Sequence, residues 1–362
     1  MKKLYKGLLA AALAIVLCLA FVLSACGGIK VTFVITDSDS ETVTVDKGSA
    51  VDQPEDPTRE GYVFSGWYAD ENCTEEFDFS TEITEKTSVY AGWLQKVEGY
   101  DFIYYMWNYS ENGEDMGQYK VEQVEDNKMV TSLATPTRDG YYLRGWYTDA
   151  ACTTEFVAGS SRITGDVTLY ALWYPGTTFE AEYTDLYDST GTTARDFHGY
   201  SNNQQGVNAV MASSSASNGY YIAGYYQTGE YLYFTINSDT AVSDAALYIT
   251  AAMEYGWDVG QSTTSLSYSD FTITVNGIQV KYNDMVFDMS SVTKSFDISP
   301  FATFYLGSIS LNAGTNTIKL EMTNETKGQG GTQDGKGCLV DCITIYTNAT
   351  LTWTPETDNI ED

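Results

Sequence analysis

The chain has 362 residues, of which 49 are acidic and 19 basic, and its formal net charge at pH 7 is −30. Because such a surface repels nucleic acid and anionic polymers, DNA and RNA binding are excluded. Aromatic residues make up 14% of the chain and only six residues are proline, so the composition, rich in Thr, Val, Ile and Gly, favours β structure.

The first segment has the features of a bacterial secretion signal. Three lysines within the first six residues precede an apolar run over residues 8–23, which is short for a spanning helix and ends in small residues. The following LSAC at residues 23–26 resembles a lipobox. That resemblance implies cleavage before Cys26 and attachment of lipid to this cysteine. We therefore expect residues 1–25 to be a lipoprotein signal peptide and the mature chain to be anchored in the lipid bilayer, outside the cell. The alternative is an ordinary signal peptide with an incidental cysteine.

The front half of the chain contains an internal repeat. PTREGYVFSGWYADENC at residues 57–73 and PTRDGYYLRGWYTDAAC at residues 136–152 lie 79 positions apart, and the match continues in TSVYAGW at 87–93 and VTLYALW at 167–173. Alternating apolar residues before the first copy predict a hairpin, and Asp101 to Val124 predict its counterpart before the second copy. Small modules of this size need packed aromatic rings for stability.

The shared pattern P-x-R-x-G-Y-x-x-x-G-W-Y with a distal L-Y-A-x-W resembles the internalin-type B-repeat, also called the Listeria–Bacteroides repeat. This resemblance implies two small β-grasp-like domains, at residues 26–96 and 97–174. In that family such domains stand in series on bacterial surface proteins and serve as spacers or in adhesion. Their aromatic residues are then expected in the cores, and the alternative is an exposed ligand-binding face.

The third segment shows no trace of the repeat. Its apolar runs alternate and are bounded by Gly, Asn, Asp or Ser, which predicts antiparallel strands and a β-sandwich. Four short motifs resemble carbohydrate-binding modules of families 6 and 35: EAE at residues 180–182, GEYLYF at 229–234, AGTNTIKL at 313–320 and VDCITI at 340–345. The resemblance implies a jelly-roll domain, expected over residues 175–349, followed by a tail over 350–362. The whole chain is thus expected to be mainly β.

Three carboxylates form a candidate metal site. Glu180 and Glu182 lie two residues apart on an expected strand and would share one face, and Asp341 on the last strand would lie beside them. Three such charges close together raise one another's pKa unless a cation intervenes, and calcium prefers oxygen ligands of this kind. The resemblance likewise implies a structural calcium here. The alternative is a solvated acidic edge.

Sugar binding requires flat aromatic faces with polar groups at their rims, carried on loops. The candidate carbohydrate-binding residues are Trp257, Tyr255, Asn218, Tyr220 and Tyr200. The resembled family often has an asparagine two residues before the aspartate of its last strand, whereas this chain has Leu339 there. The usual ligand mode of the family is therefore not expected.

These features predict a cell-surface lipoprotein that binds a polysaccharide or other glycan without catalysis, with no catalytic residues. One alternative is a protein-binding adhesin that uses the repeats. Another is a glycoside hydrolase, since two nearby carboxylates can cleave a glycosidic bond. Two carboxylates on one short strand at the start of a domain are a poor place for a catalytic acid, and His198 is the one histidine of the chain, with no nucleophile paired to it.

Overall fold

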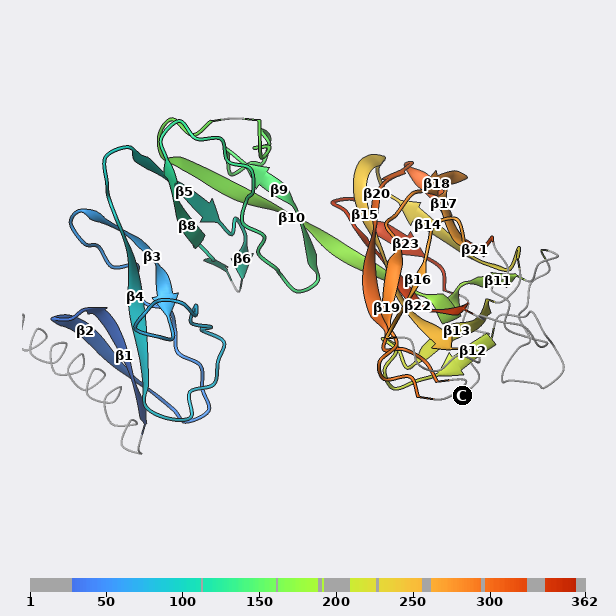
Figure 1. The fold of residues 1–362 in the computed structure, drawn as a ribbon, viewed down its shortest axis with the longest axis horizontal. Helices are drawn as coiled ribbons and strands as arrows, with labels where there is room; N and C mark the ends of the chain where they lie inside the picture. Colours follow the sequence, from blue (N-terminus) through green and yellow to red (C-terminus); the bar gives the residue numbers. More distant parts are fainter. Residues whose placement is uncertain are drawn as a thin grey trace, which may run out of the picture. The chain divides into compact units, whose positions relative to one another are not determined.

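The computed structural model describes residues 28–111, 113–160, 162–187, 191, 209–225, 228–255, 262–293, 297–323 and 336–355. These residues form strands and one 3₁₀ turn, η1 (Ala181–Tyr183), so the fold is mainly β as predicted (Figure 1). No helix in these ranges is long and apolar enough to cross a membrane. The chain divides into two compact units, residues 1–136 with 145–172, and residues 137–144 with 173–362.

The first repeat is a four-stranded sheet in the order β2-β1-β4-β3. Its strands are β1 (Ile29–Thr36), β2 (Asp39–Val45), β3 (Tyr62–Tyr68) and β4 (Thr87–Gln95). The predicted hairpin is confirmed by the antiparallel pairing of β1 with β2, and β1 runs parallel to β4 in the middle of the sheet. A central parallel pair between two antiparallel edges is the sheet order of a β-grasp domain, and Val31 and Phe33 of β1 point from it into the core.

The second repeat has the same sheet in the order β8-β5-β10-β9. Its strands are β5 (Tyr100–Met106), β8 (Gln118–Glu125), β9 (Tyr141–Tyr147) and the first part of β10 (Val167–Glu180), with a small hairpin of β6 (Ser110–Glu111) and β7 (Glu114–Asp115). β5 pairs antiparallel with β8 and parallel with β10. The hairpin predicted over residues 101–124 is therefore confirmed.

The repeated motif is explained by equivalent contacts in the two copies. Trp67 is 5% exposed and Trp146 is 2% exposed, so both tryptophans belong to the cores. The arginine of each PTR sequence stacks on the tyrosine that follows the glycine: the guanidinium carbon lies 3.9 Å from the ring centroid of Tyr62 in the first copy and 3.5 Å from that of Tyr141 in the second. These cation–π contacts tie the turn to the strand after it.

The aspartate and cysteine of each copy shape one loop. Asp70 accepts backbone N–H groups of Thr74 and Glu75, both at 2.8 Å. Asp149 accepts those of Thr153 and Thr154 in the same way. The cysteine inside each loop has a positive φ of 53°. Each aspartate thus organises the turn by satisfying backbone donors that would otherwise lack partners.

The third domain is a sandwich of two sheets, as predicted. One sheet contains β12 (Ala209–Ala212), β13 (Tyr220–Tyr225), β15 (Val242–Tyr255), β20 (Ala302–Leu311), β22 (Lys336–Tyr346) and the end of β10. The other contains β11 (Asp185–Tyr187), β14 (Tyr231–Ser238), β17 (Phe271–Val275), β18 (Ile278–Val280), β21 (Gly314–Met322) and β23 (Leu351–Trp353). A separate hairpin is formed by β16 (Thr263–Leu266) and β19 (Met285–Asp288).

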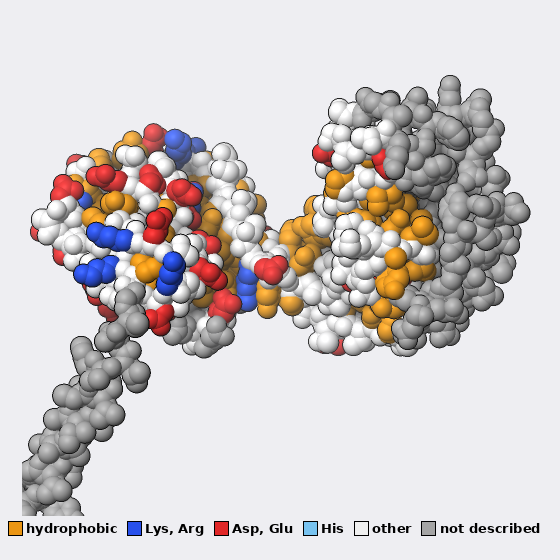
Figure 2. Space-filling view, turned by 90° about the horizontal axis from the view of Figure 1, so that it is seen from below, with side chains coloured by type: hydrophobic (Ala, Val, Ile, Leu, Met, Phe, Trp, Pro, Cys, Tyr) orange, Lys and Arg blue, Asp and Glu red, His pale blue; other side chains and the backbone are white. Residues whose placement is uncertain are grey.

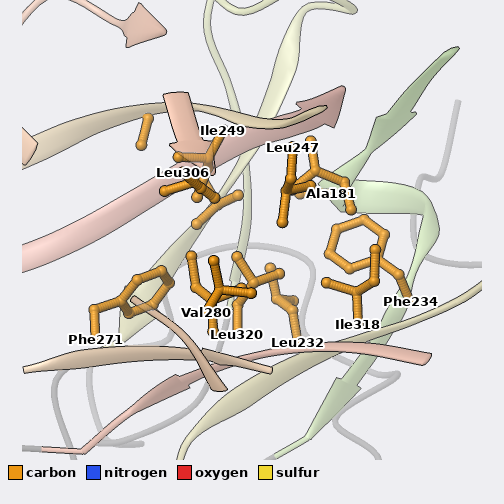
Figure 3. Packing of buried hydrophobic residues seen from close by; sticks show 14 of the residues in the cluster. Ala181, Leu232, Phe234, Leu247, Ile249, Phe271, Val280, Leu306, Ile318 and Leu320 are labelled. Carbon is orange, nitrogen blue, oxygen red and sulfur yellow. The ribbon is translucent and has the colours of Figure 1, made fainter. Parts of the chain in front are cut away.

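The core lies between these two sheets (Figure 3). Leu247 and Ile249 of β15 face Leu232 and Leu320 of the opposite sheet, and all four are fully buried. The residues expected to start the tail belong to this core as well, because β23 pairs with β14 and Trp353 lies with its ring centroid 5.4 Å from that of Phe179. The sandwich therefore includes part of the segment that the sequence pattern assigned to the tail.

Charged side chains are unevenly distributed on the visible surface. Figure 2 shows many Asp and Glu side chains, with some Lys and Arg, over the described face of the repeats, whereas the described face of the sandwich carries mainly uncharged and apolar side chains. The visible surface of the sandwich therefore offers fewer charges to a ligand than the repeats do.

Candidate functional site

The three predicted carboxylates, Glu180, Glu182 and Asp341, are brought together at one end of the sandwich; we call them the acidic centre. Phe179 and Ala181 are fully buried in the core and fix the chain where β10 ends. Glu180 is the last residue of the strand. Glu182 lies in the 3₁₀ turn η1, so the expectation that both glutamates lie on one strand is wrong. Glu182, two residues after the end of the strand, is fully buried.

A β-bulge places Asp341 beside them. In the pairing of β15 with β22, Ala251 is opposite Val340 and Thr250 is opposite Cys342, so Asp341 is an extra residue without a partner. Glu180 of β10 is opposite Cys342 on the other side of β22. The bulge turns Asp341 away from the core, and the side chain is 2% exposed. Re-aiming a side chain in this way is a common role of bulges beside functional sites.

The loop between β12 and β13 closes the acidic centre, a contact that the sequence did not predict. The hydroxyl of Ser217 donates to Glu180 Oε2 at 2.6 Å or to Asp341 Oδ1 at 3.2 Å, and its backbone N–H donates to Asp341 Oδ1 at 3.0 Å. The loop is held closed by a hydrogen bond from Ser213 N to Gly219 O. The run of Ser and Asn before β13 is typical of a polar loop. It does not indicate that Ser217 would contact Asp341, which lies 124 residues further along the chain.

Asn218 follows in the same loop and binds the other glutamate. Its Nδ2 atom donates to Glu182 Oε1 at 3.0 Å and to the hydroxyl oxygen of Tyr183 at 2.9 Å. Glu182 Oε2 is buried and has no hydrogen-bond partner. Because a buried carboxylate oxygen without a partner is costly, this atom marks the point where the centre is incomplete.

The surroundings disfavour the charged form of all three carboxyl groups. Burial raises the pKa of Glu182 to about 7, and the nearby charges of Glu180 and Asp341 act in the same direction. Burial also raises the pKa of Glu180 and of Asp341. The thiol of Cys342 lies next to them, with Sγ 3.9 Å from Asp341 Oδ2, and burial raises its pKa to about 12. The described hydrogen-bond donors to this centre, Ser217 and Asn218, are neutral.

The acidic centre is arranged as two linked halves. Ser217 joins Glu180 to Asp341, whereas Asn218 holds Glu182. Across the part of the chain that the structure describes, no three acidic, cysteine or histidine side chains converge closely enough to enclose a metal ion as they stand. The unpartnered oxygen of Glu182 and the three buried carboxyl groups are of the chemical type that a hard cation prefers.

The predicted carbohydrate-binding residues have different locations, and two of them lie outside the described residues. Asn218 is engaged with the acidic centre, and Tyr220 is a half-buried residue at the start of β13. Tyr255 ends β15, and its side chain is not described. Tyr200 and Trp257 lie outside the described residues, as does the expected lipidation site Cys26.

Leu339 is part of a second apolar cluster, which lies on the outer face of the sandwich sheet that contains β22. It is 1% exposed and packs with Tyr221 and Ala252, and Ile298 and Phe301 from the segment before β20 pack against the same cluster. Apolar side chains therefore cover the part of this face around Leu339. A ligand that needs hydrogen bonds from the position of Leu339 cannot obtain them there.

Comparison with known proteins identifies the repeats. Residues 30–92 and 105–172 match the family model of the Listeria-Bacteroides repeat domain. The chain contains two Listeria–Bacteroides repeats. Relatives of this chain are a putative Gly-rich membrane protein of Evansella cellulosilytica, 31% identical over 137 residues, and internalin H of Listeria monocytogenes, 27% identical over 138 residues. The matches cover 38% and 37% of this chain and only 15% and 23% of those proteins, so the chain spans a small part of the length of these relatives.

Solved structures are similar to about half of the chain. One is a family 35 carbohydrate-binding module from Clostridium thermocellum, with 14% identity, a TM-score of 0.28, and coverage of 47% of this chain and 96% of that one. Another is a GH26-CBM35 β-(1,4)-mannanase from Podospora anserina, with 22% identity, a TM-score of 0.26, and coverage of 50% and 27%.

Proposed function

We propose that the sandwich binds a carbohydrate without cleaving it, that a calcium ion completes the acidic centre, and that the two repeats carry this domain outward from a lipid anchor at Cys26. The observation that carries the proposal is the buried Glu182, whose second oxygen has no partner although two further carboxylates lie nearby. A divalent cation held by Glu180, Glu182 and Asp341 would compensate these charges.

The burial of the acidic centre disfavours hydrolysis by these residues. A glycosidase needs its two carboxyl groups on either side of the scissile bond, in a cleft that admits the sugar. Glu182 is fully buried, and Glu180 is tied to Ser217. Both glutamates hold the β12–β13 loop to the end of β10, so their role is structural support of the loops at this end of the sandwich.

The same arrangement supports a location for the sugar. Because Leu339 and its neighbours make their part of the sheet face apolar, we favour the loops of the sandwich as the ligand-binding region. Loops on a rigid sandwich commonly carry binding residues. Tyr200, Tyr220, Tyr255 and Trp257 remain the proposed aromatic contacts. The largely uncharged visible face of the sandwich favours a neutral polysaccharide (Figure 2).

Affinity electrophoresis of the chain without residues 1–27 would test this proposal. Gels that contain different neutral and acidic polysaccharides are run with calcium and with a chelator. We expect retardation by a neutral polysaccharide in calcium, and loss of this retardation in Trp257→Ala but not in Tyr268→Ala, a control at an exposed tyrosine on the turn after β16. If no polysaccharide retards the protein, carbohydrate binding is wrong and the repeats become the candidate binding part, as in a protein adhesin.

Calcium is tested separately by titration calorimetry. We expect binding that is lost in Glu182→Gln and Asp341→Asn and retained in Glu321→Gln, whose carboxylate pairs with Lys319 on the other sheet. Binding that is equal in all three variants would place calcium elsewhere.

A further inference from the structure

Each repeat has one sheet face that covers its own core and one outer face. In the first repeat, Val63 of β3 lies on the outer face and is 8% exposed. It is buried by Phe102 of β5 and Val121 of β8, which are each 4% exposed, and Leu94 and Tyr104 pack against this cluster. All five residues belong to one compact unit. The first repeat therefore buries apolar surface against the second.

A polar contact and a short connection accompany this cluster. Gln123 Nε2 of β8 donates to the backbone oxygen of Gln95, at the end of β4, at 2.9 Å. Only residues 96–99 separate β4 from β5. A connection this short keeps the two apolar surfaces at a high effective concentration, so even a small contact is populated.

In the second repeat, the equivalent positions contact the next domain along the chain, which is the sandwich. Tyr142 corresponds to Val63 and Tyr174 to Leu94, and both belong to the unit that contains the sandwich. The ring centroid of Tyr142 lies 6.1–6.2 Å from those of three tyrosines of the sandwich; these are Tyr248, Tyr305 and Tyr346. The hydroxyl of Tyr174 donates to Asp244 Oδ2 at 3.1 Å, and Tyr174 is 6% exposed.

Arg144 adds a charged contact to the same surface. Its Nε atom donates to Asp244 Oδ2 at 2.7 Å. The equivalent residue of the first repeat is Ser65, so this ion pair exists only where the next domain is the sandwich. The outer face at β3–β4 and at β9–β10 is thus adapted to a different neighbour in each copy.

The outer face also differs between the copies at the other two strands of each sheet, β1–β2 in the first repeat and β5–β8 in the second. Phe102, Tyr104, Val121 and Gln123 of the second repeat correspond, through the shared strand register, to Lys30, Thr32, Thr42 and Thr44 of the first. The first set contacts the preceding repeat. The second set is polar and exposed, apart from the half-buried Thr32. A polar outer surface is typical of the terminal member of an array.

We propose that the outer face at β3–β4 of each repeat, and at its equivalent β9–β10, is a docking surface for the domain that follows it in the chain, and that the polar face of β1–β2 marks the first repeat as the start of the array. The occupant of each surface is fixed by its residues: Val63 and Leu94 fit the apolar Phe102 and Val121, whereas Tyr142, Arg144 and Tyr174 fit the tyrosines and Asp244 of the sandwich. Position in the array is therefore encoded at positions of the repeat where the two copies differ.

A double-mutant cycle in the chain without residues 1–27 would test the first surface. Val63→Ala, Phe102→Ala and the double variant are compared by thermal unfolding of the repeats. We expect each single substitution to lower the Tm by about 4 °C and the double variant to lower it by clearly less than the sum, because one contact is lost only once. Lys30→Ala and Thr42→Ala, at the equivalent polar positions, are expected to leave the Tm unchanged. Additive shifts would overturn the proposal.

Hydrogen exchange gives a readout that separates docking from loss of local packing. We expect Val63→Ala in the first repeat to speed exchange of the amides of β8 in the second repeat, and Gln123→Ala, a milder change, to do so to a smaller extent. Faster exchange confined to β3 and β4 would show that Val63 stabilises only its own domain and would contradict docking. Asp244→Asn should speed exchange in residues 141–144 in the same way, with Asp239→Asn as control.

Discussion

Carboxylate side chains shape both the loops of the repeats and the acidic centre of the sandwich, but they are exposed in the loops and buried in the acidic centre. Asp70 and Asp149 are exposed and accept several backbone N–H groups, which lower their pKa below the usual range. Glu182 and Asp341 are buried and accept fewer hydrogen bonds than burial requires, so their pKa is raised. A carboxylate surrounded by backbone donors organises a loop alone, whereas a buried group of carboxylates needs a further positive partner.

The largest expected effect is the pH dependence of the sandwich in a chelator. Because the pKa of Glu182 is raised in the folded state, its neutral form stabilises the fold at low pH, and this contribution is lost as the pH rises through about 7. We expect the free energy of unfolding of the sandwich to fall by about 3 kcal/mol between pH 5 and pH 8, since one pKa unit corresponds to about 1.4 kcal/mol. Denaturant unfolding across this range measures it. With calcium present, the trend should disappear, and an unchanged trend would contradict cation binding at this centre.

Glu182→Gln should remove most of that dependence. The amide keeps an oxygen that can accept from Asn218 but carries no charge, so at pH 8 in a chelator we expect a gain of about 2 kcal/mol in the free energy of unfolding. The same variant should gain nothing from calcium. Glu321→Gln is the matched control on the opposite sheet. A destabilised Glu182→Gln would mean that the charge is already compensated in the folded chain.

Asn218→Ala should have a smaller effect of the opposite sign. It removes the side-chain N–H group that donates to Glu182 Oε1, while Glu182 Oε2 already has no partner. We expect a loss of about 1.5 kcal/mol at pH 8 and a higher pKa of Glu182, seen as a shift of the pH profile to higher pH. Ser215→Ala in the same loop is the control. An unchanged profile would show that Asn218 does not hold the glutamate in solution.

The smallest expected effect concerns the repeats. Asp70→Ala and Asp149→Ala should each lower the Tm of the repeats by a few degrees, about 3 °C, because the loop loses its hydrogen-bond acceptor. Their lowered pKa reverses the pH trend: the stabilisation is present above the ordinary pKa of aspartate and is lost as the pH falls below it. Glu60→Ala, an exposed carboxylate near the same motif, is the control. Stability that rises with acid in the repeats would contradict this comparison.

The sequence predicted the parts of the fold that depend on pattern. Alternation and the repeated aromatic residues predicted both small domains, and the separate EAE and VDCITI motifs predicted that Glu180, Glu182 and Asp341 would lie together. The 3₁₀ turn that carries Glu182 was not predicted, because a two-residue spacing fits both a strand and a tight turn. Ser217 was missed since its contact depends on the approach of a distant loop. The docking surfaces lie at positions where the two copies differ, which a search for similarity passes over.

The extra residue at Asp341 has a consequence for what the gene can tolerate. On the N-terminal side of the bulge Cys338 and Val340 face the core, and on the other side Ile343 and Ile345 do so, which strict alternation cannot achieve without one added residue. Deleting this single codon would restore regular alternation and turn Leu339 inward and Val340 outward, or push the whole strand end out of register. Substitutions at neighbouring positions change only one side chain. Selection on this strand therefore acts on its length as strongly as on its composition, and alignments of related chains should show no gaps between the residues equivalent to 336 and 346.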